Sequence, residues 1–135
     1  MIVKVCGMKF PENIRQVARC GADWMGFICY EKSPRFIGTE KPESTPRQKR
    51  VGVFVNSDKA YILDHANKWD LQMAQLHGNE PPELCRQLRE AGLQVIKAFQ
   101  ANEENLVSKT EAYAPFCDYF LFDTPCNNYG GSGLS

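Results

Sequence analysis

Short apolar runs alternate with amphipathic stretches along the chain. The apolar runs predict six β-strands, which we place at residues 2–6, 23–30, 50–55, 71–77, 94–99 and 118–123. Helical spacing of apolar residues predicts helices over residues 11–21, 57–69, 80–92 and 102–114, with Ser57 as the N-cap of the second. Residues 31–48 contain three prolines, which favour a loop with at most a short helix.

This alternation predicts a parallel sheet whose right-handed crossovers place helices outside it. Two architectures compete, an open doubly wound sheet and a (β/α) barrel. No G-x-G-x-x-G follows the first strand, which disfavours the dinucleotide-binding form of the open sheet. Several strands also carry polar residues at alternate positions, such as Lys4, Gln75 and Lys97. A barrel interior tolerates such residues near its mouth better than a sheet covered on both faces does.

Composition narrows the classes of partner. The 135 residues include 16 basic and 16 acidic side chains, so no net field attracts nucleic acid. No apolar run approaches the roughly 20 residues that span a bilayer, and the start "MIVKVCGMKF" lacks the pattern of a signal peptide. We therefore expect a cytoplasmic protein without nucleic-acid or membrane partners.

The chain has six cysteines but no C-x-x-C pair. An even number of cysteines is compatible with a disulfide framework, but no secretion signal accompanies them. The missing C-x-x-C spacing disfavours zinc and thioredoxin-like sites. We expect reduced thiols, most of them small core residues, and no metal site.

Chemically useful side chains occur where the predicted strands end. In either architecture the carboxyl ends of parallel strands carry the site. The side chains at or just after these ends are Cys6, Arg35, Gln75, His77 and Asp123, followed by the glycine-rich stretch with Gly130, Gly131 and Ser132. A thiol, a guanidinium, an imidazole and a carboxylate should therefore converge on one rim.

Each of these residues also has a purely structural interpretation. Taken alone, Cys6 is more often a small core residue, His77 a hydrogen-bonded structural histidine and Asp123 a turn cap. Alternation nevertheless puts Lys4 and Cys6 on the same strand face, where an ammonium group favours a thiolate. The Ser-Pro-Arg sequence that ends at Arg35 stiffens the long loop and suits anion capture.

Several motifs together carry a family resemblance. In order, they are "KVCGM", "GADWMGFICYEKSPRFIG", "VGVFVN", "QLHGNEPPE", "VIKAF" and "FLFDT…YGGSG". They resemble the phosphoribosylanthranilate isomerase family of tryptophan biosynthesis, whose members are TIM barrels, over residues 2–133. The resemblance implies an Amadori rearrangement of N-(5-phosphoribosyl)anthranilate to 1-(o-carboxyphenylamino)-1-deoxyribulose 5-phosphate, without a cofactor.

The resemblance also implies roles for matching positions. Cys6 matches the general base that removes the C2 proton, Asp123 the general acid that opens the ribose ring, and Arg35 a residue near the anthranilate. The expected substrate-binding residues are Arg35, Gln75, His77, Gly130, Gly131 and Ser132. The expected partner is accordingly a small-molecule sugar phosphate.

A (β/α)₈ barrel needs about 200 residues or more. The resemblance therefore implies a C-terminally truncated barrel domain over residues 1–135, with about six parallel strands, five crossover helices and impaired activity because strands seven and eight are missing. The first and sixth strands would be exposed edges, through which we expect homo-oligomers. Two alternatives stay open. One is another sugar-phosphate barrel enzyme, such as indole-glycerol-phosphate synthase, whose lysine and glutamate pattern is absent. The other is a catalytically inactive barrel fragment that self-assembles or needs a partner.

Overall fold

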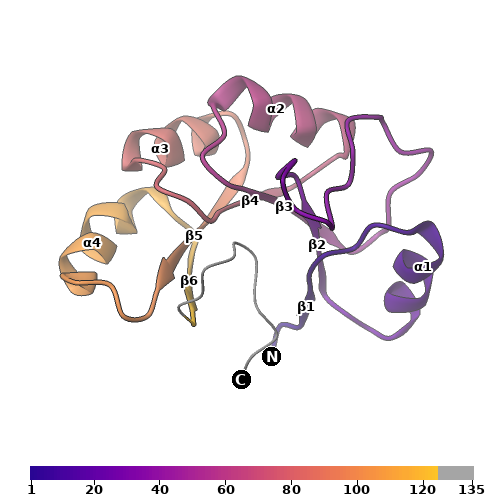
Figure 1. The fold of residues 1–135 in the computed structure, drawn as a ribbon, viewed down its shortest axis with the longest axis horizontal. Helices are drawn as coiled ribbons and strands as arrows, with labels where there is room; N and C mark the ends of the chain where they lie inside the picture. Colours follow the sequence, from indigo (N-terminus) through magenta and orange to yellow (C-terminus); the bar gives the residue numbers. More distant parts are fainter. Residues whose placement is uncertain (125–135) are drawn as a thin grey trace.

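The computed structural model describes residues 1–124. Six parallel strands form one sheet in the order β1-β2-β3-β4-β5-β6. Their bounds are β1 (Lys4–Val5), β2 (Trp24–Ile28), β3 (Lys49–Phe54), β4 (Met73–Leu76), β5 (Gln94–Gln100) and β6 (Tyr119–Asp123). A doubly wound sheet would reverse its strand order at a switch point, and this sheet does not. It curls instead into part of a barrel (Figure 1), which confirms the barrel-type prediction.

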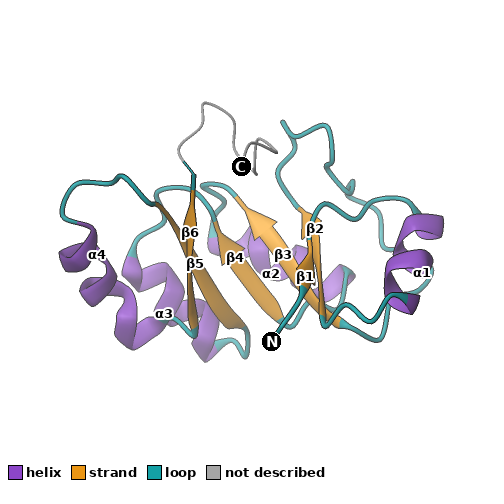
Figure 2. Ribbon diagram, turned by 90° about the horizontal axis from the view of Figure 1, so that it is seen from below, coloured by secondary structure: helices purple, strands orange, loops and turns teal. Residues whose placement is uncertain are grey.

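Four α-helices lie along the outer, convex side of the curled sheet (Figures 1 and 2). They are α1 (Pro11–Arg19), α2 (Lys59–Lys68), α3 (Pro82–Glu90) and α4 (Leu106–Tyr113), and a 3₁₀-helix, η1 (Ala114–Phe116), follows α4. The expectation of five crossover helices is wrong, because the connection between β2 and β3 has no helix. Its three prolines remove backbone donors and fix φ, which prevents a helix from propagating.

The helix N-termini follow local rules, with one correction. Pro11 and Pro82 occupy the first turns of α1 and α3, where a missing N–H costs no hydrogen bond. The N-cap of α2 is Asp58 rather than the predicted Ser57. The Asp58 carboxylate accepts a hydrogen bond from the Tyr61 backbone N–H at 2.8 Å. Both residue types cap well, so the sequence does not decide between neighbours.

The main hydrophobic core fills the space between the sheet and the helices. Its largest fully buried side chains include Met25, Phe27, Phe54, Ile62, Leu76 and Leu88. Along each strand, the residues that face the helices alternate with residues that face the concave side, as a pleated strand requires. This layer fixes the outer face of the sheet and leaves the concave face to carry a second set of side chains.

The barrel interior was the predicted place for Lys97, and that placement is wrong. Lys97 shares the outer strand face with Val95, and its ammonium lies over the ring of Tyr113 from α4. The Lys97 Nζ donates to the Gly78 carbonyl at 2.8 Å and to Glu80 Oε1 at 3.3 Å. The prediction is right for Lys4 and Gln75, because they hydrogen-bond to each other across the concave face, from β1 to β4.

A smaller apolar cluster lies on the concave face near the amino ends of the strands. Val51, Met73 and Ile96 form it, with Trp24 and Leu121 packed against them. The Trp24 ring also meets the Tyr119 ring edge-on, with centroids 5.1 Å apart, so that β2 and β6 touch across the inside of the curl. This apolar cluster therefore lies below the polar side chains at the carboxyl ends of the strands, which we call the rim.

The described cysteines are free thiols: Cys6, Cys20, Cys29, Cys85 and Cys117. Cys126 lies outside the described residues. Free thiols agree with the prediction for residues 1–124, but the expectation that most cysteines are small core residues is wrong, because only Cys29 and Cys85 of the described cysteines are buried. In that part of the chain, moreover, no helix is long and apolar enough to cross a membrane.

Candidate active site

Cys6 lies directly after β1 and is supported by a glycine in β2. A Cβ atom added to Gly26 would lie 2.8 Å from the Cys6 Sγ, closer than real contacts allow, and 3.1 Å from the Lys4 Cε, which is tighter than most real contacts. Only glycine at this buried strand position lets both side chains cross β2. Lys4 and Cys6 therefore share the concave face, as strand alternation predicts.

Arg35 reaches the same place from the loop after β2. Gly7 has φ +81°, and a Cβ there would lie 2.5 Å from the Arg35 Nη1. The loop is turned back by two hydrogen bonds, from the Arg35 N–H to the Ser33 Oγ at 3.2 Å and from the Ile37 N–H to the Ile28 carbonyl at 3.0 Å. The guanidinium thus lies against the backbone that directly follows Cys6.

A chain of hydrogen-bonded side chains crosses the concave face from β1 to β6. The Lys4 ammonium donates to the Gln75 Oε1, and the Gln75 Nε2 lies 3.2 Å from the His77 Nδ1. The His77 Nε2 in turn lies 3.2 Å from the Asp123 Oδ2. The structure therefore joins four side chains from β1, β4 and β6 that the sequence separates by up to 119 residues (123 − 4).

The four hydrogen-bonded side chains differ in charge and exposure. Burial lowers the pKa of His77, and hydrogen bonding and attraction to Asp123 partly offset that effect. Burial likewise lowers the pKa of Lys4, while its contact with Cys6 raises it. The His77 side chain is 13% exposed and that of Asp123 is 30% exposed. The carboxylate of Asp123 is thus more exposed than the imidazole of His77, and a substrate can reach it.

Asp123 is held at both carboxylate oxygens. Its Oδ1 accepts the Thr124 backbone N–H at 2.9 Å, and its Oδ2 faces His77. Its backbone carbonyl accepts the Ala101 N–H at 3.0 Å, which fixes the carboxyl end of β6 against the end of β5. These contacts aim the carboxyl group along the rim.

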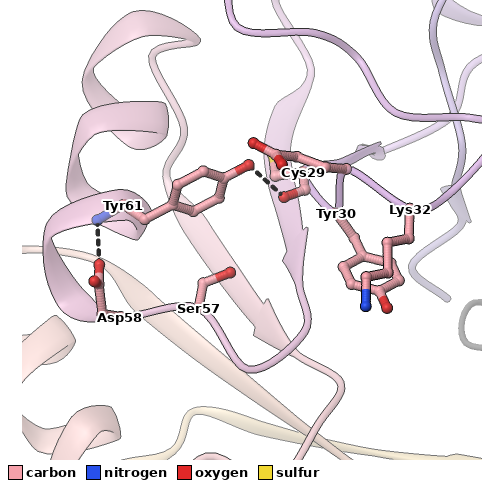
Figure 3. Close-up of a pocket in the computed structure, with 7 residues that line it drawn as sticks. Cys29, Tyr30, Lys32, Ser57, Asp58 and Tyr61 are labelled. Carbon is pink, nitrogen blue, oxygen red and sulfur yellow. Dashed lines mark hydrogen bonds between the residues drawn. The ribbon is translucent and has the colours of Figure 1, made fainter.

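The predicted site is thus assembled in part. Cys6, Arg35, Gln75, His77 and Asp123 lie at the carboxyl ends of their strands or just after them, as predicted. Gly130, Gly131 and Ser132 lie outside the described residues. A separate hollow of about 320 Å³ lies between the loop after β2 and the start of α2 (Figure 3). None of its lining residues was predicted to be a site residue. They are Cys29, Tyr30, Glu31, Lys32, Ser57, Asp58 and Tyr61.

The hollow is closed at one side by Tyr61. Its hydroxyl donates to the Cys29 carbonyl at 3.0 Å, as Figure 3 shows. Burial raises the pKa of Tyr61 to about 12, so the phenol stays neutral and keeps this donor. The hydroxyl is therefore occupied by the backbone of the neighbouring loop.

Sequence reasoning missed two supports of the rim. The first is Gly26, and a glycine inside an apolar strand was the available signal. The second is Glu80, whose carboxylate accepts the backbone N–H groups of Asn56 and Gly78, each at 2.9 Å. Glu80 thus ties the ends of β3 and β4 together just beyond His77. Its place at the start of a predicted helix gave no sign of this role, since acidic residues are common there.

The curled parallel sheet, its outer helices and its polar rim define a β/α-barrel protein with its candidate site at the carboxyl ends of the strands. The family model for N-(5'phosphoribosyl)anthranilate (PRA) isomerase matches residues 3–135. An N-(5'-phosphoribosyl)anthranilate isomerase from Phocaeicola vulgatus is 52% identical over 134 residues, 98% of this chain and 65% of the relative. The chain belongs to the N-(5'-phosphoribosyl)anthranilate isomerase family.

Solved structures agree with this assignment. Phosphoribosyl anthranilate isomerase from Thermotoga maritima superposes with a TM-score of 0.84 at 41% identity, covering 98% of this chain and 66% of that one. A phosphoribosyl anthranilate isomerase in complex with reduced 1-(o-carboxyphenylamino)-1-deoxyribulose 5-phosphate gives a TM-score of 0.80 at 40% identity, covering 93% and 66%. The chain thus spans only part of the length of the proteins it matches.

Proposed function

We propose that the concave rim isomerises N-(5'-phosphoribosyl)anthranilate to 1-(o-carboxyphenylamino)-1-deoxyribulose 5-phosphate. The observation that carries this proposal is that Cys6 and Asp123 come from opposite edges of the sheet, β1 and β6, and share its concave face. An aldose-to-ketose shift needs an acid and a base on two sides of one sugar. The activity of the relatives and the product analogue bound to one of them support the same reaction.

In the proposed reaction the acid acts first. Asp123 gives a proton to the ribose ring oxygen as the C1–O bond breaks, and the anthranilate nitrogen lone pair forms a C1=N bond. Cys6, as a thiolate, then takes the proton from C2. The C2–H electrons form a C1=C2 bond and return the C=N electrons to nitrogen, which gives an enolamine that tautomerises to the ketone. Lys4 lies beside Cys6 on the concave face of the sheet, so its ammonium group is next to the residue that takes the C2 proton.

Binding of the substrate involves groups around these two. Arg35 offers a planar guanidinium beside Gly7, suited to a carboxylate or an aromatic ring such as those of anthranilate. Gly130, Gly131 and Ser132 are proposed to contact the substrate as well, although they lie outside the described residues. The proposed ligand is therefore an aromatic amine joined to a sugar phosphate.

The test follows product formation by chromatography, with the chain in excess over N-(5'-phosphoribosyl)anthranilate. We expect conversion above the uncatalysed rate, and background conversion with Cys6→Ala or Asp123→Asn. A second form, called the extended chain below, joins this chain to the part of the Phocaeicola vulgatus relative beyond the matched segment, and it should convert faster. Conversion unaffected by either substitution in both forms, or absent in both forms, would overturn the proposal.

A second candidate function is that of an assembling fragment without activity. β1 and β6 are the edge strands of the described sheet, and they are flanked by exposed apolar residues. These residues are Ile2, Val3, Tyr119 and Phe122. Unpaired edges next to apolar side chains favour association with a second copy. Sedimentation of a monodisperse monomer at high concentration would count against homo-oligomers.

The free thiols of the described residues support a reducing compartment, and we propose the cytoplasm.

A further inference from the structure

The polar chain on the concave face contains two residues that are not needed as acid or base. Gln75 is 3% exposed, and its Oε1 and Nε2 face Lys4 and His77. The two ring nitrogens of His77 likewise face Gln75 and Asp123. Every polar atom of these two side chains that could meet a substrate is therefore already engaged. Both residues were first expected to bind the substrate directly, but a substrate-binding role does not explain these contacts with Lys4 and Asp123.

The Lys4 ammonium fixes which way the Gln75 amide points. An ammonium group has three donors and no acceptor, so it must face the amide oxygen. The amide NH₂ then faces the His77 Nδ1. Because an NH₂ group only donates, Nδ1 must be the unprotonated ring nitrogen. The orientation of one amide thus selects the tautomer of the neighbouring imidazole.

The selected tautomer carries its proton on Nε2 and directs it at Asp123. The separation of 3.2 Å between His77 Nε2 and Asp123 Oδ2 allows that hydrogen bond. Burial also disfavours the imidazolium form, and the charged groups that act on the ring are Asp123, Lys97 and Lys4. His77 is therefore a neutral donor whose direction is set by its neighbours.

We propose that Gln75 and His77 are positioning residues for Asp123. Lys4 orients Gln75, Gln75 holds His77 as the Nε2–H tautomer, and His77 donates to Asp123 Oδ2 while the Thr124 N–H holds Oδ1. The role rests on the proposed function. After Asp123 passes its proton to the ring oxygen, two donors already stand at the carboxylate that forms. Donors placed in advance stabilise such a charge without reorganisation in the transition state.

The same chain does not carry protons from Cys6 to Asp123. A neutral amide does not exchange a proton between its nitrogen and its oxygen, so Gln75 interrupts any relay. The thiol and the carboxyl group must each be reset after a turnover through solvent or substrate. Asp123, 30% exposed, is open to such exchange. These hydrogen-bonded side chains therefore orient the Asp123 carboxyl group and do not conduct protons to it.

The test reads the His77 tautomer directly by long-range ¹H–¹⁵N NMR of the uniformly ¹⁵N-labelled chain. The protein has two histidines, so His65→Gln assigns the remaining imidazole to His77. At pH 7 we expect a neutral ring with a protonated Nε2 and an unprotonated Nδ1. Gln75→Glu, which is almost isosteric, presents an acceptor to Nδ1. It should protonate that nitrogen and move the His77 titration to higher pH, as a nearby carboxylate does.

The matched control is Gln87→Glu, the same chemical change on α3 at the outer face of the sheet, which should leave the His77 spectrum unchanged. An Nδ1–H tautomer, an even mixture or an imidazolium in the unmodified chain at pH 7 would overturn the proposal, whether or not the variants fold. An unchanged spectrum in a folded Gln75→Glu variant would also overturn it. These spectra need no turnover, so they stand apart from a failure to isomerise N-(5'-phosphoribosyl)anthranilate.

Discussion

Two lysines in the sheet, Lys4 on β1 and Lys97 on β5, are parts of two different polar clusters. Lys97 faces the helices, where it is 3% exposed and pairs with Glu80, itself 1% exposed. The Lys97 ammonium also donates to the carbonyls of Leu76, Gly78 and Ala98. Lys4 faces the concave side and begins the chain that ends at a partly exposed carboxylate.

The difference lies in whether a cluster is closed. In the outer cluster the charges satisfy one another and the backbone, and the Tyr113 hydroxyl adds a donor to the Glu80 carbonyl. Burial raises the pKa of Tyr113 to about 12, which keeps that donor in place. The inner chain ends at Asp123, which retains access to solvent. Closed clusters hold elements together, whereas an open one can act on a ligand.

The largest expected effect is on activity, at the open end of the inner chain. Asp123→Asn cannot donate an acidic proton, and Cys6→Ala cannot accept one, so we expect each to slow isomerisation by about 10²- to 10⁴-fold. Chromatographic assay of the extended chain measures this. Urea unfolding of the same variants should change by less than about 1 kcal/mol, as for partly exposed sites. A loss of activity that simply follows a loss of stability would contradict the assignment.

The largest effect on stability should come from the outer cluster. Lys97→Met leaves Glu80 buried without its partner, and we expect the free energy of unfolding to fall by about 3–5 kcal/mol. The matched change at the inner chain, Lys4→Met, removes one hydrogen bond from a partly exposed site and should cost only about 1 kcal/mol. Urea denaturation of both variants makes the comparison. Equal losses in the free energy of unfolding would show that the two lysines contribute equally to stability and would contradict the comparison.

A smaller, mixed effect is expected at the glycine beneath Cys6. Gly26→Ala places a methyl group 2.8 Å from the Cys6 Sγ, so the thiol and Lys4 must move. Overpacking of this kind costs about 1–3 kcal/mol. The displaced thiol should also lower turnover in the extended chain. As a control, Gly21→Ala tests a glycine with no neighbouring atom within 4 Å but with φ +81°, so it costs stability without moving Cys6.

His77 should separate orientation from binding. In the extended chain, His77→Leu removes the donor to Asp123, and we expect kcat to fall about tenfold with KM little changed. Because a glutamine amide can reach the position of Nε2 and donate, His77→Gln should recover part of the loss. A rise in KM alone would return His77 to the class of substrate-binding residues.

The smallest expected effect is the pH dependence of stability at His77. Its pKa is lowered in the folded chain, so the unfolded chain takes up a proton first as the pH falls below about 6.5. Stability is therefore lost between that pH and the lower folded pKa, by at most about 1.4 kcal/mol per pH unit. His77→Gln removes this contribution, so its unfolding free energy should fall less between pH 7.5 and pH 5.5. An identical fall in both proteins would contradict the burial argument.

Periodicity alone predicted the sheet well. Alternating apolar runs located all six strands, and the signal was clearest for the central strands, whose outer faces carry the core beneath the helices and must be apolar there. The connection between β2 and β3 was less clear, since prolines show that a helix fails but not where the loop goes. Its return to Gly7 depends on contacts between distant residues, which no local pattern contains.

The rim was predictable as a set of positions but not as a network. Strand ends indicated Cys6, His77 and Asp123, because parallel strands share one carboxyl edge. The order in which Lys4, Gln75 and His77 hydrogen-bond depends on the curvature of the sheet, which brings β1 near β4. Lys97 was misplaced because alternation shows only that it faces the side opposite to Ile96. The register of β5 puts Ile96 on the concave face and Lys97 on the outer face.

The most direct measurement compares Asp123→Asn with Lys97→Met in the extended chain, at a temperature where both variants are folded by circular dichroism. We expect that Asp123→Asn loses at least about 10²-fold in turnover and keeps its unfolding midpoint. Lys97→Met should lose stability and keep most of its turnover. Parallel losses of turnover and stability in both variants would contradict the division between an open catalytic chain and a closed structural cluster.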